Sequence, residues 1–195
     1  MSWTRFVTGL TLPLGVALAV GPTTVHAQGD MDCLTNAEPD ALAQRASPLD
    51  SVSFELAGAT VKVCYGRPSA NGRTMIGGAS VPYGRLWRTG ANEPTIIRTP
   101  VALTIAGVAV APGTYSLYSI PNQDAWDVIV NRSYSQWGHE RQYTEEVAAQ
   151  EVGRGKVVTE TLDEHVETFT ILARDGHLVF EWETTRVLIP IGPTS

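Results

Sequence analysis

Residues 95–130 read TIIRTPVALTIAGVAVAPGTYSLYSIPNQDAWDVIV. Short runs of β-branched and aromatic residues alternate here with turn-forming groups, namely Ala106-Gly107, Pro112-Gly113 and a polar turn at residues 122–124. Alternation of apolar and polar residues is typical of strands that bury one face. Several short strands at such close spacing predict a meander within a β-sandwich or a barrel.

The same pattern continues on both sides of this stretch. Upstream, residues 52–56 and 61–65 alternate around Ala57-Gly58 and predict a β-hairpin. Downstream, residues 166–173, 178–183 and 186–191 have strand character. One short helix is expected near residues 144–152, with Thr144 as its cap and Gly153 and Gly155 as its end. The sequence therefore predicts an all-β protein, with a single β-sandwich or jelly-roll-like domain over residues 47–191.

The first segment of the chain is predicted to be a targeting signal. Residues 1–27 combine a basic Arg5, an apolar core over residues 6–20 and a small residue at Ala27, as in a secretory signal peptide. Cleavage after Ala27 would leave a polar N-terminal arm over residues 28–46 and no membrane span. The alternative is an uncleaved anchor, although the apolar run is short for a span. The mature protein is thus expected to be periplasmic or extracellular.

Export changes the interpretation of the two cysteines. In an oxidising compartment Cys33 and Cys64 can form a disulfide that holds the N-terminal arm on the first hairpin. A loop of this length is worth about 3–4 kcal/mol in the chain-entropy model. The alternative is a buried, free Cys64 and a mobile Cys33. No metal site is expected, because two isolated cysteines lack the paired spacing of zinc ligands.

The distribution of charge narrows the range of partners. The chain has 14 Lys and Arg against 20 Asp and Glu, a formal net charge of −6. This acidic balance argues against nucleic acid as a partner, because binding to a phosphate backbone depends on clustered basic residues. Residues 56–92, however, contain five basic side chains and no acidic one.

The arginines of this basic segment are interleaved with aromatic residues. An arginine can hold a carboxylate or phosphate through two hydrogen bonds, and an aromatic ring offers a flat face for a sugar. The pattern predicts a site for a small anionic or saccharide ligand, whose candidate residues are Arg67, Arg73, Tyr83, Trp87, Arg88, Asn92, Glu93 and Trp137. Alternatively, the arginines pair with acids such as Glu93, Glu181 or Glu183, and Trp137 only closes one end of the core.

The sequence offers little support for catalysis. It has no G-x-S-x-G nucleophile motif and no phosphate-binding loop. His139-Glu140 begins like a zinc-protease helix, but Tyr143 stands where the second histidine is needed. No cofactor is therefore expected. Glu93 is the one candidate catalytic residue, as a general base whose pKa nearby arginines would lower. Alternatively, Glu93 neutralises Arg88 or Arg67 and stiffens the loop.

Several short motifs together resemble one protein family. They are Val63–Ser69, Gly72-Arg73, Val81–Gly84, Leu86–Glu93, Pro112–Leu117, Asn131, Gln136–Gly138, Glu181–Glu183 and Arg186-Val187. The combination is similar to the domain-of-unknown-function family 2911 over residues 47–191. The resemblance implies exported bacterial proteins with one compact domain and no agreed activity, and it supplies no catalytic residues.

Three functions are compatible with these observations. The first is a binding module for a small anionic or saccharide ligand. The second is a hydrolase-like enzyme in which Glu93 is the base and the arginines orient an anionic substrate. The third is a structural protein of the cell envelope. The absence of a recognisable nucleophile or metal motif favours the binding module. The oligomeric state stays open.

Overall fold

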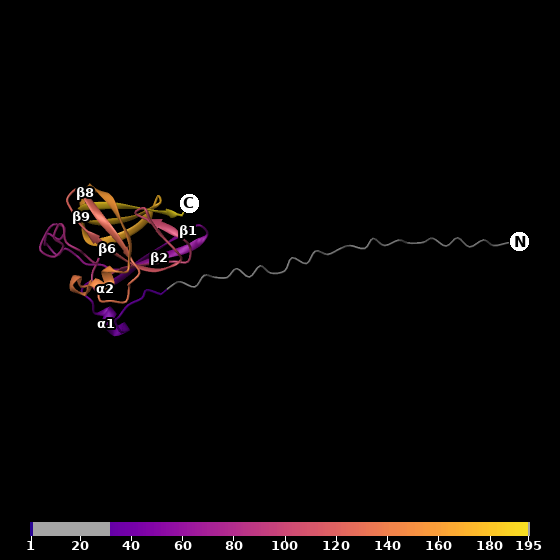
Figure 1. The fold of residues 1–195 in the computed structure, drawn as a ribbon, viewed down its shortest axis with the longest axis horizontal. Coiled ribbons are helices and arrows are strands. Elements are labelled where there is room, and N and C mark those ends of the chain that lie inside the picture. The colour runs from indigo at the N-terminus through magenta and orange to yellow at the C-terminus, as the bar shows by residue number, and fades with distance from the viewer. Residues whose placement is uncertain (2–31, 195) are drawn as a thin grey trace.

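The structure is a computed structural model that describes Met1 and residues 32–194 (Figure 1). Apart from Met1, the expected signal peptide and its cleavage site after Ala27 lie outside the described residues. No helix among residues 32–194 is long and apolar enough to cross a membrane.

Nine strands in the described part of the chain form one antiparallel sheet, so the prediction of an all-β fold is confirmed. The strands are β1 Leu49–Leu56, β2 Ala59–Gly66, β3 Thr95–Thr99, β4 Leu103–Ile105, β5 Val108–Val110, β6 Gly113–Ile120, β7 Ala125–Asn131, β8 Glu151–Arg174 and β9 His177–Pro193. Their order in the sheet is β1-β2-β3-β6-β7-β8-β9-β4-β5. The hairpin predicted around Ala57-Gly58 is the β1–β2 pair.

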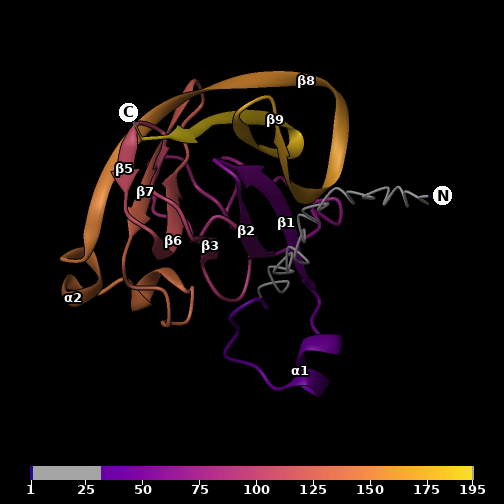
Figure 2. The same ribbon diagram turned by 90° about the vertical axis from the view of Figure 1, so that its right-hand side faces the viewer.

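Two long strands fold this sheet over on itself. The first half of β8 pairs with β7, and its second half pairs with β9, which also pairs with β4. In Figure 2, β8 arcs across the molecule between these partners. The β8–β9 register shifts between Thr161 and Val166 and again before Thr170. Such irregularities bend strands, and the two halves of the sheet thereby face each other as two layers.

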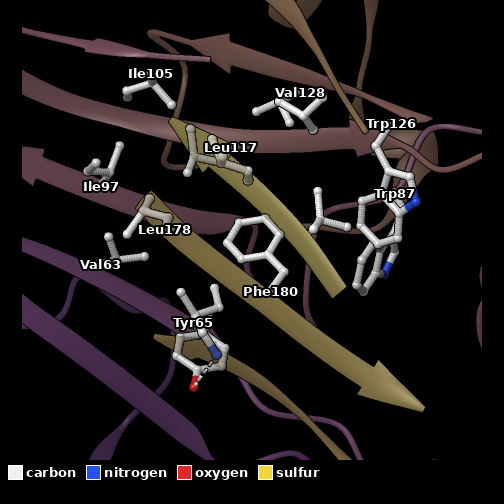
Figure 3. Packing of buried hydrophobic residues seen from close by; sticks show 14 of the residues in the cluster. Val63, Tyr65, Trp87, Ile97, Ile105, Leu117, Trp126, Val128, Leu178 and Phe180 are labelled. Atoms are coloured by element: carbon white, nitrogen blue, oxygen red, sulfur yellow. Dashed lines mark hydrogen bonds between the residues drawn. The ribbon is translucent and has the colours of Figure 1, made fainter. Parts of the chain in front are cut away.

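The interior between the layers is apolar. Val63, Ile97 and Leu117 from β2, β3 and β6 lie opposite Leu178 and Phe180 of β9 (Figure 3). All five side chains are buried. The sequence predicted two separate strands at residues 178–183 and 186–191, but β9 is continuous and bends at Glu183, whose φ is 51°.

The helices are short. The expected helix near residues 144–152 forms only as α2, Glu145–Ala148, and the Thr144 hydroxyl accepts a hydrogen bond from the backbone N–H of Val147. Two further helices are the 3₁₀ turn η1, Glu140–Gln142, and α1, Pro39–Ala43, which the sequence did not predict. Gly153 and Gly155 do not end α2 as predicted, because both lie within β8.

These two glycines allow the turn between β4 and β5 to approach β8. A β-carbon at Gly155 would overlap the carbonyl oxygen of Ala106. We therefore expect Gly155→Ala to lower the free energy of unfolding by about 1–3 kcal/mol, the usual cost of overpacking. Urea denaturation measures this loss. Gly192→Ala is the control, because the nearest atom to a β-carbon at that position is 3.9 Å away. Equal losses in both variants would contradict the expectation.

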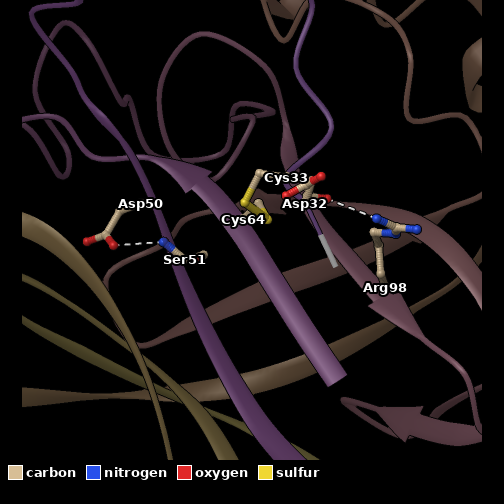
Figure 4. Close-up of a disulfide and its surroundings, with 6 residues drawn as sticks. All are labelled: Asp32, Cys33, Asp50, Ser51, Cys64 and Arg98. Atoms are coloured by element: carbon tan, nitrogen blue, oxygen red, sulfur yellow. Dashed lines mark hydrogen bonds between the residues drawn. A yellow bond between two sulfur atoms is a disulfide. The ribbon is translucent and has the colours of Figure 1, made fainter. Parts of the chain in front are cut away.

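The N-terminal arm is covalently attached to the sheet, as predicted. Cys33 and Cys64 form a disulfide that joins residue 33 to β2, with the two Cα atoms 5.7 Å apart (Figure 4). Beside it, the Arg98 guanidinium donates a hydrogen bond of 2.9 Å to the carbonyl oxygen of Asp32. Residues 32 and 33 of the arm are thus attached to β3 and β2.

Candidate functional site

The long loop between β2 and β3, residues 67–94, carries most of the predicted site residues, but it does not bring them to one surface. Arg67 lies beside β1 and β8, where its guanidinium is 3.5 Å from the Asp50 carboxylate and donates to the Thr170 hydroxyl at 3.0 Å. Arg73 folds back and donates to the carbonyl oxygens of Ala70 and Ser69. Both arginines therefore stabilise the first part of the loop.

Trp87 lies in the core instead of on a ligand-binding face. Its side chain is 3% exposed, and its ring packs against Trp126, Trp182 and Phe169. The indole N–H donates to the carbonyl oxygen of Gly90. The backbone of Trp87 forms two hydrogen bonds with Ser119 of β6, and these hold this part of the loop against the sheet.

Glu93 anchors the N-terminal arm. Its carboxylate accepts two hydrogen bonds from the Arg45 guanidinium, at 2.7 and 2.8 Å, and further ones from the Thr35 hydroxyl and the Asn36 backbone N–H. Burial raises the pKa of Glu93, but these hydrogen bonds outweigh burial and hold the pKa below its ordinary value. The arginine that pairs with Glu93 is Arg45, whereas the sequence had suggested Arg88 or Arg67. Both oxygens are occupied, which is the geometry of an ion-pair anchor and leaves a substrate no free base.

Asn92 and Trp137 lie at the same contact with the arm. The Asn92 side chain donates to the carbonyl oxygen of Ser47, and its own carbonyl accepts from the Gly138 N–H. The Arg45 guanidinium carbon is 5.8 Å from the centre of the Trp137 ring, which is 41% exposed. We define the arm contact as Arg45 on one side and Asn92, Glu93 and Trp137 on the other.

A cleft of about 410 Å³ with both polar and apolar lining residues opens beside the second half of the same loop. It is lined by side chains of the loop and of the segment around η1, namely Ala79, Ser80, Pro82, Arg85, Leu86, Glu140 and Tyr143. Arg85 is exposed and forms no ion pair with any described residue. Arg88 lies next to a residue of the cleft lining, with its Nε 3.9 Å from a Glu140 oxygen. We call this the Arg85 cleft.

Tyr83 follows Pro82 in the sequence but does not line the Arg85 cleft. Its ring is 46% exposed and covers Gly77, where a β-carbon would lie only 2.5 Å from a ring atom. Of the predicted ligand residues, only Arg88 therefore contacts a side chain that lines the Arg85 cleft.

A network of tyrosines supports the wall of the Arg85 cleft. The Tyr143 hydroxyl donates to Glu151 at 2.5 Å and accepts from the Asn131 amide. Burial, followed by this hydrogen bond to Glu151, raises the pKa of Tyr143. Tyr118 packs edge-on against Tyr143, with ring centres 4.7 Å apart, and its hydroxyl accepts from Gln136. Tyr143 is therefore held as a neutral phenol in one position.

Sequence reasoning missed most of the residues of this cleft. Arg85 was noted only as one of the basic residues of the segment, and Glu140 and Tyr143 only as parts of a failed zinc motif. The one local sequence signal is the glycine before Arg85, since Gly84 adopts a φ of 71° in the structure. Nothing in a single sequence pairs that turn with residues 140–143. Among the described residues, no group of three or more His, Cys, Asp or Glu side chains is placed to hold a metal ion.

The fold and the cleft define a class: an all-β protein with one folded antiparallel sheet, a disulfide-anchored arm and a cleft beside the long loop between β2 and β3. Residues 47–191 match the family described as "Protein of unknown function (DUF2911)", and the chain belongs to this family. The matched region contains Glu93, Trp137 and the Arg85 cleft, whereas Cys33 and Arg45 precede it. Neither a curated protein nor a solved structure was found to match the chain.

Proposed function

We propose that the protein is a binding module for a small acidic saccharide, and that the ligand binds in the Arg85 cleft. The observation that carries the proposal is the exposed Arg85 guanidinium, which lines the cleft without an ion-pair partner among the described residues. An unpaired guanidinium holds a carboxylate through two charge-assisted hydrogen bonds. Arg67 and Arg88 differ from it, since each already faces a carboxylate.

The other side chains of the cleft favour a sugar over a bare anion. The Glu140 carboxylate lines the cleft and is 35% exposed, so that besides its contacts with Arg88 at 3.9 Å and His139 at 3.7 Å it can accept a hydrogen bond from a sugar hydroxyl. Pro82 and Leu86 provide an apolar surface for the C–H face of a ring. The volume of about 410 Å³ falls within the roughly 300–1,000 Å³ of small-molecule sites.

The proposal also includes a location outside the cytoplasm. The Cys33–Cys64 disulfide is compatible with an oxidising environment outside the cytoplasm, where saccharides of the cell envelope are found. We propose that residues 1–27 direct export and that residues 28–46 remain as the arm of a mature protein with one domain.

The substitution Arg85→Ala tests the site. We expect the wild-type chain to bind glucuronate or galacturonate and Arg85→Ala to bind it about 10- to 100-fold more weakly, which matches the loss of hydrogen bonds to a charged group. Isothermal titration calorimetry at fixed ionic strength measures both affinities. Glucose and acetate, tested in parallel, show whether the sugar ring or the carboxylate alone is recognised.

Arg132→Ala is the matched control, because Arg132 is an exposed arginine outside the cleft lining. Its affinity for the uronate should equal that of the wild-type chain. If neither uronate binds the wild-type chain, or if both variants lose affinity equally, the Arg85 cleft is not a saccharide site. A structural role in the envelope would then explain the chain better.

A further inference from the structure

The arm contact joins the N-terminal arm to the region that matches the family. Glu93 lies within the region that matches the family, whereas Arg45 lies before it. The two side chains are 7% and 9% exposed and meet through two parallel hydrogen bonds. A carboxylate this deeply buried requires a cationic partner, and among the described residues that partner comes from outside the family domain.

The family domain also supplies a second element of recognition. Trp137 presents its ring to the Arg45 guanidinium at 5.8 Å. A carboxylate that accepts two parallel hydrogen bonds, with an aromatic ring above the same cation, matches the planar shape of a guanidinium. A lysine ammonium carries no such planar fork. The contact is therefore shaped for arginine and discriminates against lysine.

The arm supplies its arginine at high local concentration. The arm is attached to the domain on both sides of Arg45 in the sequence. The Cys33–Cys64 disulfide attaches it on the N-terminal side, and the hydrogen bond from Asn92 to the Ser47 carbonyl attaches it on the C-terminal side. Arg45 thus binds as an intramolecular ligand, which a free competitor cannot displace easily. Glu93 also borders a pocket of about 200 Å³, lined by Leu34, Thr35, Asn36, Glu93, Ile96, Tyr134 and Ser135.

We propose that Glu93 and Trp137 form a binding site for the arginine side chain of a peptide, and that this chain occupies the site with Arg45 of its own arm. When Arg45 is removed, the site is open to a guanidinium group supplied from solution. This site is separate from the Arg85 cleft, and the proposal does not depend on saccharide binding.

Rescue of the Arg45→Ala variant by methylguanidinium tests the proposal. The full disulfide-bonded variant is titrated with methylguanidinium chloride, or with methylammonium chloride as the matched ion, at constant ionic strength. We expect methylguanidinium to raise the Tm of Arg45→Ala in a saturable way, by about 3–6 °C at ten times the dissociation constant. Methylammonium should give no such increase, and the wild-type chain should respond to neither beyond the effect of salt.

The double variant Arg45→Ala/Glu93→Gln distinguishes this site from general stabilisation, because it lacks the carboxylate that receives the guanidinium. A saturable increase of the same size in the double variant, or no increase in Arg45→Ala, would overturn the proposal. If Arg45→Ala does not fold alone, the refolding yield of the two variants with and without methylguanidinium gives the same comparison.

Two amino-acid derivatives test whether the site binds an arginine that belongs to a peptide. N-acetyl-arginine amide represents an arginine within a peptide, and N-acetyl-lysine amide is the control of similar size and charge. Arg45→Ala should bind the arginine derivative at least about tenfold more tightly. Equal binding of the two derivatives, or binding of methylguanidinium alone, would exclude a site for peptide arginine.

Discussion

Replacing Trp87 by alanine is expected to lower the free energy of unfolding by about 3–5 kcal/mol, the usual cost of removing a large buried aromatic side chain. The ring is 3% exposed, stacks on Trp182 with centres 5.9 Å apart, and meets Trp126 edge-on at 5.8 Å. Its loss would leave a cavity between the long loop and both layers of the sheet. Urea denaturation followed by far-UV circular dichroism measures the effect.

Trp137→Ala is the natural comparison, because the sequence had placed both tryptophans in one ligand-binding surface. Trp137 is 41% exposed and contacts the Arg45 guanidinium. Its removal should cost only about 0.5–1 kcal/mol, the range of an exposed cation–π contact. Similar losses in the two variants would show that Trp87 does not anchor the loop.

The second large effect is expected at the arm. Arg45→Ala should lower the free energy of unfolding by about 3–5 kcal/mol near neutral pH, because it leaves the buried Glu93 carboxylate without its cation. The same urea titration measures it. Arg73→Ala is the control, since Arg73 is exposed and donates only to carbonyls of its own loop. Its loss should stay below about 1 kcal/mol. Equal losses would contradict the importance of the buried pair.

The difference between the wild-type chain and Arg45→Ala should depend on pH. In the folded wild-type chain the pKa of Glu93 lies below its ordinary value of 4.5. A carboxyl group with a lowered pKa contributes stability that is complete above the ordinary pKa and is lost as the pH falls through the folded-state pKa. The stability difference between the two chains should therefore narrow as the pH falls below about 5. A difference that grows in acid would contradict the ion-pair assignment.

The sequence predicted most of the strands, although not residues 151–165 of β8, and it predicted the site poorly, for different physical reasons. Strands follow from local alternation, such as that of Val61, Val63 and Tyr65, which places every second side chain in the core. The disulfide followed from the presence of two cysteines in a chain expected to be exported. These inferences use residues that are close together or chemically distinctive. They do not require knowledge of how distant loops fold.

The site depends on contacts between distant segments. Glu93 was grouped with the arginines next to it in the sequence, yet its partner is Arg45, 48 residues earlier. Trp87 lies in a loop without periodicity, so nothing local indicated that it packs against Trp182 of β9. The Arg85 cleft likewise combines a loop before β3 with Glu140 beyond β7. A cluster of basic residues in the sequence did not become a cluster in space.

The continuity of β8 has a consequence for how the molecule unfolds. One strand of 24 residues belongs to both layers, paired with β7 through its first half and with β9 through its second. Neither layer can lose its order without releasing part of the strand that the other layer requires. Partial melting of one layer is thereby penalised, and the two layers form a single cooperative unit with one shared transition.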